Sequence, residues 1–136
     1  MAIKKDGRDY ILETKENQYN LKLTFKALDY LDNVYTLEDE DSKIKFGFGV
    51  NKLVVGLQMK NVTAIIHFIK ATTLHLAQKP SEEELIEMID LLSDKDYDGL
   101  FDIIIDFLTA AALTKHTMKK IEQAAKKEQK QVAKKN

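Results

Sequence analysis

The 136-residue sequence contains no cysteine and a single proline. Without cysteine the chain has neither disulfides nor a thiolate metal site, which is typical of proteins from a reducing compartment. The N-terminus also lacks an apolar run, because Lys4, Lys5 and Arg8 occur among its first eight residues, and we expect no signal peptide. Together these absences predict a cytoplasmic protein.

Long uninterrupted apolar runs are missing as well. The longest apolar stretch, residues 62–76, contains His67, Lys70 and His75 and is too short to cross a bilayer. A chain of this length forms one domain and buries roughly two thirds of the surface of its unfolded state. We therefore expect one soluble domain that is not inserted in a membrane.

Charge of both signs is plentiful but unevenly distributed. Residues 1–114 carry 13 Lys and Arg against 20 Asp and Glu, whereas residues 115–136 carry eight Lys and two Glu. An acidic body does not suit nucleic acid, because neutralising phosphates requires a positive face. We expect no nucleic-acid partner and interpret the basic C-terminal segment as a solvated tail, with contact to an acidic partner as the alternative.

The N-terminal third changes from a strand pattern to a helix pattern. Apolar residues alternate over 10–13 and 19–25, which predicts a β-hairpin. Over 25–35 the apolar spacing becomes helical, with Thr24 placed as the N-cap. Residues 1–8 show neither pattern and are expected to be flexible.

The middle of the chain combines a short strand with two helices. Residues 44–48 alternate and predict a third strand, and Asn51 is placed to cap a short helix. Residues 62–76 predict a helix that is apolar over most of its circumference, which places it at the centre of the domain or under a partner. Pro80 is expected to end that helix.

The C-terminal part predicts further helices. Ser81 and Glu84 form a capping box, in which the hydroxyl accepts from a free amide and the carboxylate reaches back to the Ser81 amide. Residues 97–113 predict the next helix. The lysine-rich segment after Thr114 predicts a projecting helix that becomes disordered after Ala125.

These elements predict an α+β fold that is mainly α-helical. A small N-terminal antiparallel β-hairpin packs on a bundle of about five helices, and a basic helical or disordered tail follows. The expected division is a flexible N-terminus at 1–8, a single globular domain at 9–113 and the tail at 114–136.

One acidic segment resembles the first half of an EF-hand calcium loop, with Asp94, Asp96 and Asp98 at alternate positions and Gly99 after them. The bidentate acidic ligand expected at the twelfth position falls on Ile105, however. We therefore reject a metal site here. The segment is interpreted as an acidic loop in which Asp96 or Asp98 caps the following helix.

The residue types that carry catalysis are present but not in catalytic patterns. The three histidines lack the spacing of metal ligands, and Ser81 does not lie in a nucleophile-elbow sequence. The carboxylates after Pro80 lie at predicted helix starts and exposed faces, where the helix dipole and solubility account for them. We expect a protein that is not an enzyme and binds no cofactor.

Apolar side chains remain as the candidate for function. The segment at 46–57 and the apolar helix at 62–76 exceed what one small core obviously needs. The ordinary interpretation is that the core covers them; the alternative is a groove for an amphipathic partner helix, or a self-association face. The residues expected to form this groove are Phe46, Phe48, Val54, Leu57, Ile65, Ile66, Phe68 and Ile69.

Three segments together resemble a known family: YNLKLTFKALDYLD at 19–32, GFGVNKLVVGLQ at 47–58 and KPSEEEL at 79–85. Their order and pattern are similar to those of the tail assembly chaperones of long-tailed, siphovirus-type phages and prophages of Gram-positive bacteria. The resemblance covers about residues 8–120.

The resemblance implies a chaperone that binds and solubilises the tape-measure protein, a very long helical polypeptide, and recruits tail-tube subunits during tail morphogenesis. It implies the cytoplasm of the bacterial host as the location, and absence from the mature virion. Expected partners are the tape-measure protein, the tail-tube protein, a longer frameshifted form of the same chain and further copies of itself. The alternative is a structural tail-completion or connector protein retained in the virion.

Overall fold

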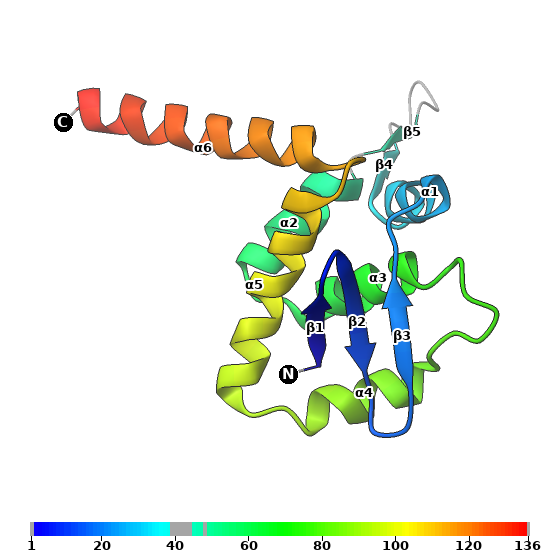
Figure 1. Ribbon diagram of the computed structural model, residues 1–136. Coiled ribbons are helices and arrows are strands. Elements are labelled where there is room, and N and C mark those ends of the chain that lie inside the picture. The colour runs from blue at the N-terminus through cyan, green and yellow to red at the C-terminus, as the bar shows by residue number, and fades with distance from the viewer. Residues whose placement is uncertain (1, 39–44, 48, 136) are drawn as a thin grey trace.

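The computed structural model describes residues 2–38, 45–47 and 49–135 of the chain. These residues form five strands and six helices. Figure 1 shows a three-stranded sheet with helices around it and α6 leaving the body as a separate arm. The prediction of a mainly helical α+β fold with a small antiparallel N-terminal sheet is therefore confirmed.

The N-terminal sheet has one strand more than predicted. Its strands lie in the order β1, β2, β3 and are all antiparallel; they are β1 (Ile3–Asp6), β2 (Asp9–Glu13) and β3 (Gln18–Leu21). The predicted hairpin is β2 with β3. The expectation that residues 1–8 are flexible is wrong for the described part, because Ile3 is buried and pairs with Leu12. Gly7, with φ of 62°, makes the tight turn between β1 and β2.

Helices α1, α2 and α3 pack against one another. Their bounds are Phe25–Val34 for α1, Gly49–Gln58 for α2 and Val62–Thr72 for α3. The predicted N-cap of α1 is confirmed, since the Thr24 hydroxyl accepts from the Ala27 amide at 3.1 Å. Asn51 does not cap α2, because that helix already begins at Gly49. Pro80 does not end α3 as predicted, because that helix already ends at Thr72.

A second, two-stranded sheet joins α1 to α2. Strand β4 (Thr36–Glu38) pairs antiparallel with β5 (Lys45–Gly47). The prediction of a third strand at 44–48 therefore holds for 45–47, and its partner β4 was not predicted. Residues 44 and 48 lie outside the described part of the chain.

The last three helices run from the base of the molecule to its projecting arm (Figure 1). They are α4 (Glu82–Asp90), α5 (Asp94–Ala110) and α6 (Lys115–Lys135). Ser93 caps α5 by accepting from the Asp96 amide at 3.2 Å, so the prediction that Asp96 or Asp98 is the cap is wrong. The disorder expected after Ala125 is also wrong, because α6 continues to Lys135.

The core lies where the sheet meets α3 and α5. Phe107 of α5 packs edge-to-face against Phe68 of α3, with ring centroids 5.1 Å apart, and against Tyr10 of β2, at 4.9 Å. Edge-to-face pairs of this kind add to the stabilisation from burial alone. This aromatic row ties strands from the start of the chain to helices from its middle and end.

Candidate functional site

An apolar pocket lies where α6 leaves the body, and we call it the α5–α6 pocket. Its volume is about 270 Å³. Val54 of α2, Ile105 of α5 and Met118 and Ile121 of α6 line it, with Lys119 also present. Val54 and Met118 are buried and Ile121 is half-buried, so the pocket opens from the edge of the core toward the arm.

A second, wider hollow lies beside it, between α2 and α6, and we call it the α2–α6 hollow. Its volume is about 530 Å³, and it shares Gln58, Ile121 and Ala125 with the α5–α6 pocket. Val55 of α2 lines it and is 53% exposed. Lys120 and Glu128 contribute one charge of each sign, so this hollow combines apolar surface with a balanced pair of charges.

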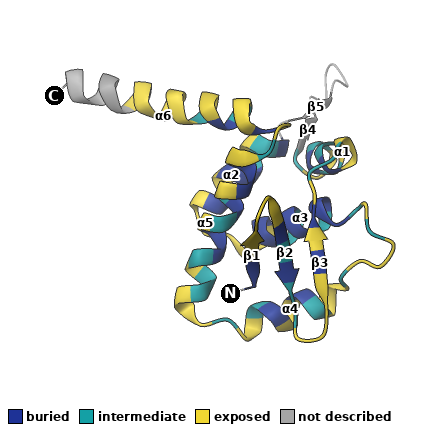
Figure 2. Ribbon diagram, in the orientation of Figure 1, coloured by how far each residue is buried: buried dark blue, intermediate teal, exposed yellow. Residues whose placement is uncertain are grey.

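The turn between α5 and α6 explains why these hollows exist. Thr114 is fully buried, and its hydroxyl donates to the Leu108 carbonyl at 2.6 Å. The chain therefore changes direction sharply after Ala110. The spacing of Met118, Ile121 and Ala125 then keeps one apolar stripe of α6 toward the body. Figure 2 shows the rest of the described arm mostly exposed.

The structure places at least half of the residues of the predicted groove in the core. Leu57, Ile65, Phe68 and Ile69 are almost completely buried in the core, so in this conformation their side chains are not available to a partner. Ile66 is half-buried and packs against the same core. Only Val54 of the described set lines one of the two apolar hollows, namely the α5–α6 pocket. Phe46 lies in β5, and its side chain and all of Phe48 are outside the description.

The sequence pattern predicts burial of these side chains, but it does not distinguish cover by the chain itself from cover by a partner. The helix at 62–76 was expected either at the centre of the domain or under a partner. Packing of α3 against α1 and α2, together with Phe107 from α5, covers it within the chain. No local pattern predicted the lining from Ile105 and Met118, which come from helices far along the sequence.

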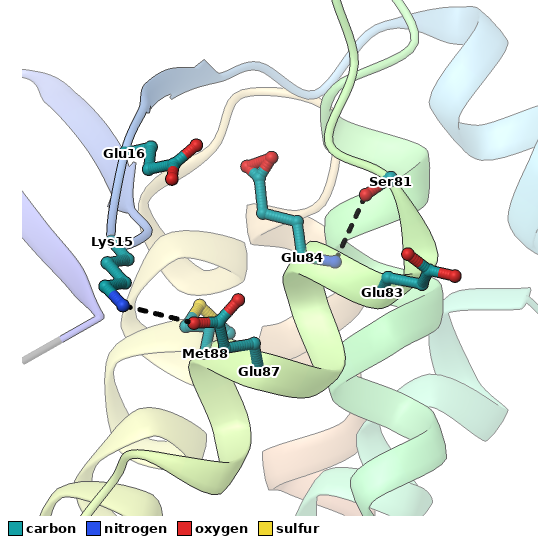
Figure 3. A pocket seen from close by; sticks show the side chains of 7 residues that line it. All are labelled: Lys15, Glu16, Ser81, Glu83, Glu84, Glu87 and Met88. Atoms are coloured by element: carbon teal, nitrogen blue, oxygen red, sulfur yellow. Dashed lines mark hydrogen bonds and ion pairs between the residues drawn. The ribbon is translucent and has the colours of Figure 1, made fainter.

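A third hollow is acidic rather than apolar and lies over the start of α4 (Figure 3). Its volume is about 240 Å³, and its lining residues are Lys15, Glu16, Ser81, Glu83, Glu84, Glu87 and Met88. The Ser81 hydroxyl accepts from the Glu84 amide at 3.1 Å, which confirms half of the predicted capping box. Lys15 lies 3.8 Å from the Glu87 carboxylate.

The other half of the capping box is replaced by a long-range contact. The Glu84 carboxylate accepts hydrogen bonds from the hydroxyls of Tyr19 and Thr14 on the β2–β3 hairpin. Burial, and then the bond to Glu84, raise the pKa of Tyr19 to about 12. These contacts hold the hairpin against α4, so Glu84 has a structural role in this hollow.

Asp94, Asp96 and Asp98 lie in the first turns of α5, which is a helix and not a ligand loop. Within the described residues no group of three or more His, Cys, Asp or Glu side chains is placed to hold a metal ion. Asp98 instead lies 3.2 Å from the Lys60 ammonium. In the same described part, no helix is long and apolar enough to span a membrane.

His67 is a half-buried titratable group on α3. Its ring packs edge-to-face against Tyr35, with centroids 5.2 Å apart, and more loosely against Tyr30. Its Nδ1 is buried and has no hydrogen-bond partner among the described residues. Burial, and then the charge of Lys70, lower the pKa of His67.

Comparison with known proteins assigns the family. The model of a family described as phage tail assembly chaperone protein, TAC, matches residues 11–123, which include residues 11–13 of β2, all of β3, all of α1 to α5 and the root of α6. No curated protein and no solved structure matches the chain. The match agrees with the resemblance of the three sequence segments and includes most of the residues that line both apolar hollows. The chain therefore belongs to the phage tail assembly chaperone family.

Proposed function

We propose that this chain binds and solubilises the tape-measure protein of a phage tail and recruits tail-tube subunits to it during assembly. The observation that carries the proposal is the family match over residues 11–123. The phage is proposed to be long-tailed and to infect a Gram-positive host, as the resemblance implies. The chain acts in the host cytoplasm, carries out no catalysis and is absent from the finished virion.

Physical chemistry supports such a role. A very long helical polypeptide exposes apolar stripes that aggregate until the tail tube encloses them. Many small subunits that each bind one stretch of the helix can cover those stripes reversibly. Recognition of an amphipathic helix requires an apolar recess for its anchor side chains.

The α5–α6 pocket is the recess that we propose for this client helix. This pocket opens at the surface, whereas Leu57, Phe68 and Ile69 of the predicted groove are buried in the core. Of the predicted set, Val54 lines the pocket. Ile105, Met118 and Ile121 supply an apolar lining, and Lys119 and Glu122 at its margin offer both charges to the flanks of a bound helix. The proposed binding site for the partner therefore lies at the start of α6 and not on the helix at 62–76.

Co-expression with the tape-measure protein tests the proposal. We expect the tape-measure protein in the soluble fraction only when this chain is present, and co-purification of the two. Ile105→Ser should reduce the soluble yield by about tenfold, because it removes apolar lining, whereas Phe25→Ser at an exposed site elsewhere should not. A tape-measure protein that is equally soluble without the chain contradicts the chaperone function.

Mass spectrometry of purified particles tests the predicted absence from the virion. We expect only traces of this chain in mature particles. A stoichiometric amount would instead assign the chain to the structural tail-completion or connector class.

A further inference from the structure

We propose that α6 is a hinged arm with two positions. In the bent position of this structure, α6 forms one wall of the α5–α6 pocket. In the straight position, α5 and α6 join into one continuous helix and the pocket is uncovered. The inference goes beyond the proposed function, because it concerns two conformations of the free chain and is tested without a client.

The break between α5 and α6 falls on residues that favour a helix. Residues 111–114 are Ala-Ala-Leu-Thr and include neither Gly nor Pro, the residues at which helices are usually interrupted. Alanine and leucine are among the strongest helix formers. The local sequence therefore favours a continuous helix, and the bend visible in Figure 1 is held by contacts with the rest of the molecule.

The bend is made at Ala111. Its φ of −70° is helical, but its ψ of 135° is extended. Helical hydrogen bonds resume directly after it, since the Lys115 amide donates to the Ala111 carbonyl at 2.9 Å. Rotation of ψ at Ala111 toward about −42° turns α6 back into line with α5. A residue at the end of an element that absorbs such a change is a typical hinge.

The bend also exchanges one hydrogen bond for another. The carbonyl of Leu108 accepts from the buried Thr114 hydroxyl at 2.6 Å. In a continuous helix the same carbonyl accepts from the amide of Ala112, four residues further on. The Leu108 carbonyl is therefore satisfied in both positions, and neither position carries the cost of leaving it unpaired.

Apolar contacts of α6 decide between the two positions. Met118 is buried and Ile121 is half-buried, and both line the pocket together with Val54 and Ile105. Straightening carries Met118 and Ile121 away from α2 and exposes Val54. In water this loss of burial favours the bent position. An apolar ligand that covers the same side chains removes the loss, and it therefore shifts the population toward the straight position.

The distance between two spin labels tests the hinge in the free protein. The chain has no cysteine, so Lys95→Cys in α5 and Lys127→Cys in α6 direct the labels to these two exposed positions. In one straight helix the two residues lie about 48 Å apart, and the bend brings them closer. We expect a major short distance and a minor long one. Dilution with unlabelled chain removes distances between copies.

Two substitutions at the hinge shift the balance in opposite directions. Thr114→Ala removes the hydroxyl bond of the bend and should raise the ratio of long to short distances about fivefold. Ala112→Pro should abolish the long distance, because a proline inside a helix lacks the amide and clashes with the Leu108 carbonyl. The same proline suits the bend, since the residue before a proline favours the extended ψ that Ala111 has.

Thr109→Ala is the matched control. Its hydroxyl donates to the Ile105 carbonyl at 2.8 Å within α5, so its loss should leave the distances unchanged. A single short distance in both the wild type and Thr114→Ala overturns the proposal. So does a long distance that persists in Ala112→Pro, because the joining of the helices would then not be its cause.

The dye ANS, which fluoresces on exposed apolar surface, tests whether straightening uncovers the pocket. Its emission should rise in Thr114→Ala and fall in Ala112→Pro, in the order of the long-distance fractions. Far-UV circular dichroism and a cooperative thermal transition show that each variant is folded. Emission that does not follow the long-distance fraction among folded variants contradicts the uncovering of the pocket.

Discussion

The hydroxyl of Tyr19 lies 2.7 Å and 2.6 Å from the two carboxylate oxygens of Glu84, although 65 residues separate them in the chain. Tyr19 is buried in β3, and Glu84 stands in the first turn of α4. The bond therefore fixes the edge of the N-terminal sheet to the acidic base of the molecule. It is charge-assisted, which makes it stronger than a bond between neutral groups.

Tyr19→Phe should lower the free energy of unfolding by about 1–2 kcal/mol, because it removes this hydrogen bond while keeping the buried ring. Urea denaturation measures the difference. Tyr97→Phe is the matched control, since its hydroxyl makes a longer, exposed bond of 3.3 Å to the Lys60 carbonyl. Equal effects of the two substitutions would mean that the Glu84 contact adds no stability.

Gly49→Ala should destabilise the protein by about 2 kcal/mol, because a Cβ at this position would lie 2.6 Å from backbone atoms of Leu31 and Asp32 in α1. The approach of α2 to α1 is that close because the Gly49 amide donates to the Asp32 carboxylate at 2.9 Å. Thermal unfolding checks this prediction. Gly7→Asn has open space, with nothing within 4 Å, but a positive φ that only partly suits Asn, so it should cost less than Gly49→Ala, about 0.5–1 kcal/mol.

Phe68→Ala should cost about 3–5 kcal/mol, because it leaves a cavity in the aromatic row that also contains Phe107. Phe25→Ala should fall within about 0.5 kcal/mol of the wild type, since Phe25 is 75% exposed. Chemical denaturation of both variants gives the comparison. A small loss at Phe68 would restore the earlier interpretation of this residue as part of a surface groove.

Stability should decrease as the pH is lowered from about 7 to about 5, in part through His67. Its folded pKa lies below the unfolded value near 6.5, so the unfolded state binds the proton first and acidification favours unfolding. His67→Phe keeps an aromatic ring between Tyr30 and Tyr35 and should make this decrease smaller. His116→Gln, at an exposed position, should leave this decrease unchanged. The urea midpoint of each variant at the two pH values measures this change in stability. An equal fall in midpoint for the wild type and His67→Phe would contradict the assignment to His67.

Local signals in the sequence predicted the structural features that depend only on residues close together in the chain. The N-cap at Thr24 and the hydroxyl cap at Ser81 were predicted correctly, because a cap is satisfied by amides two or three residues away. The β2–β3 hairpin and most helix centres follow from apolar spacing for the same reason. The strand β1 escaped prediction because only Ile3 and Ala2 of its segment are buried, too few for a period to be recognised.

The candidate sites were much less predictable. Apolar spacing at 62–76 required burial of Phe68 and Ile69, but it left open whether the cover belonged to the chain or to a partner. The α5–α6 pocket combines residues as distant as Val54 and Ile121, and only the turn at Thr114 brings them together. The sequence also predicts that a carboxylate lies at the start of α4, but not which group it binds. Glu84 was expected to bind the Ser81 amide and instead accepts a hydrogen bond from Tyr19.

By itself the sequence determined the class of fold, the helix caps at Thr24 and Ser81 and the separation of an acidic body from a basic arm, since each follows from residues close together in the chain. Tertiary structure alone decided which apolar side chains remain exposed and which hollows they line. The physical reason is that burial is a property of packing between distant segments, and the same apolar face is core or interface according to what packs against it.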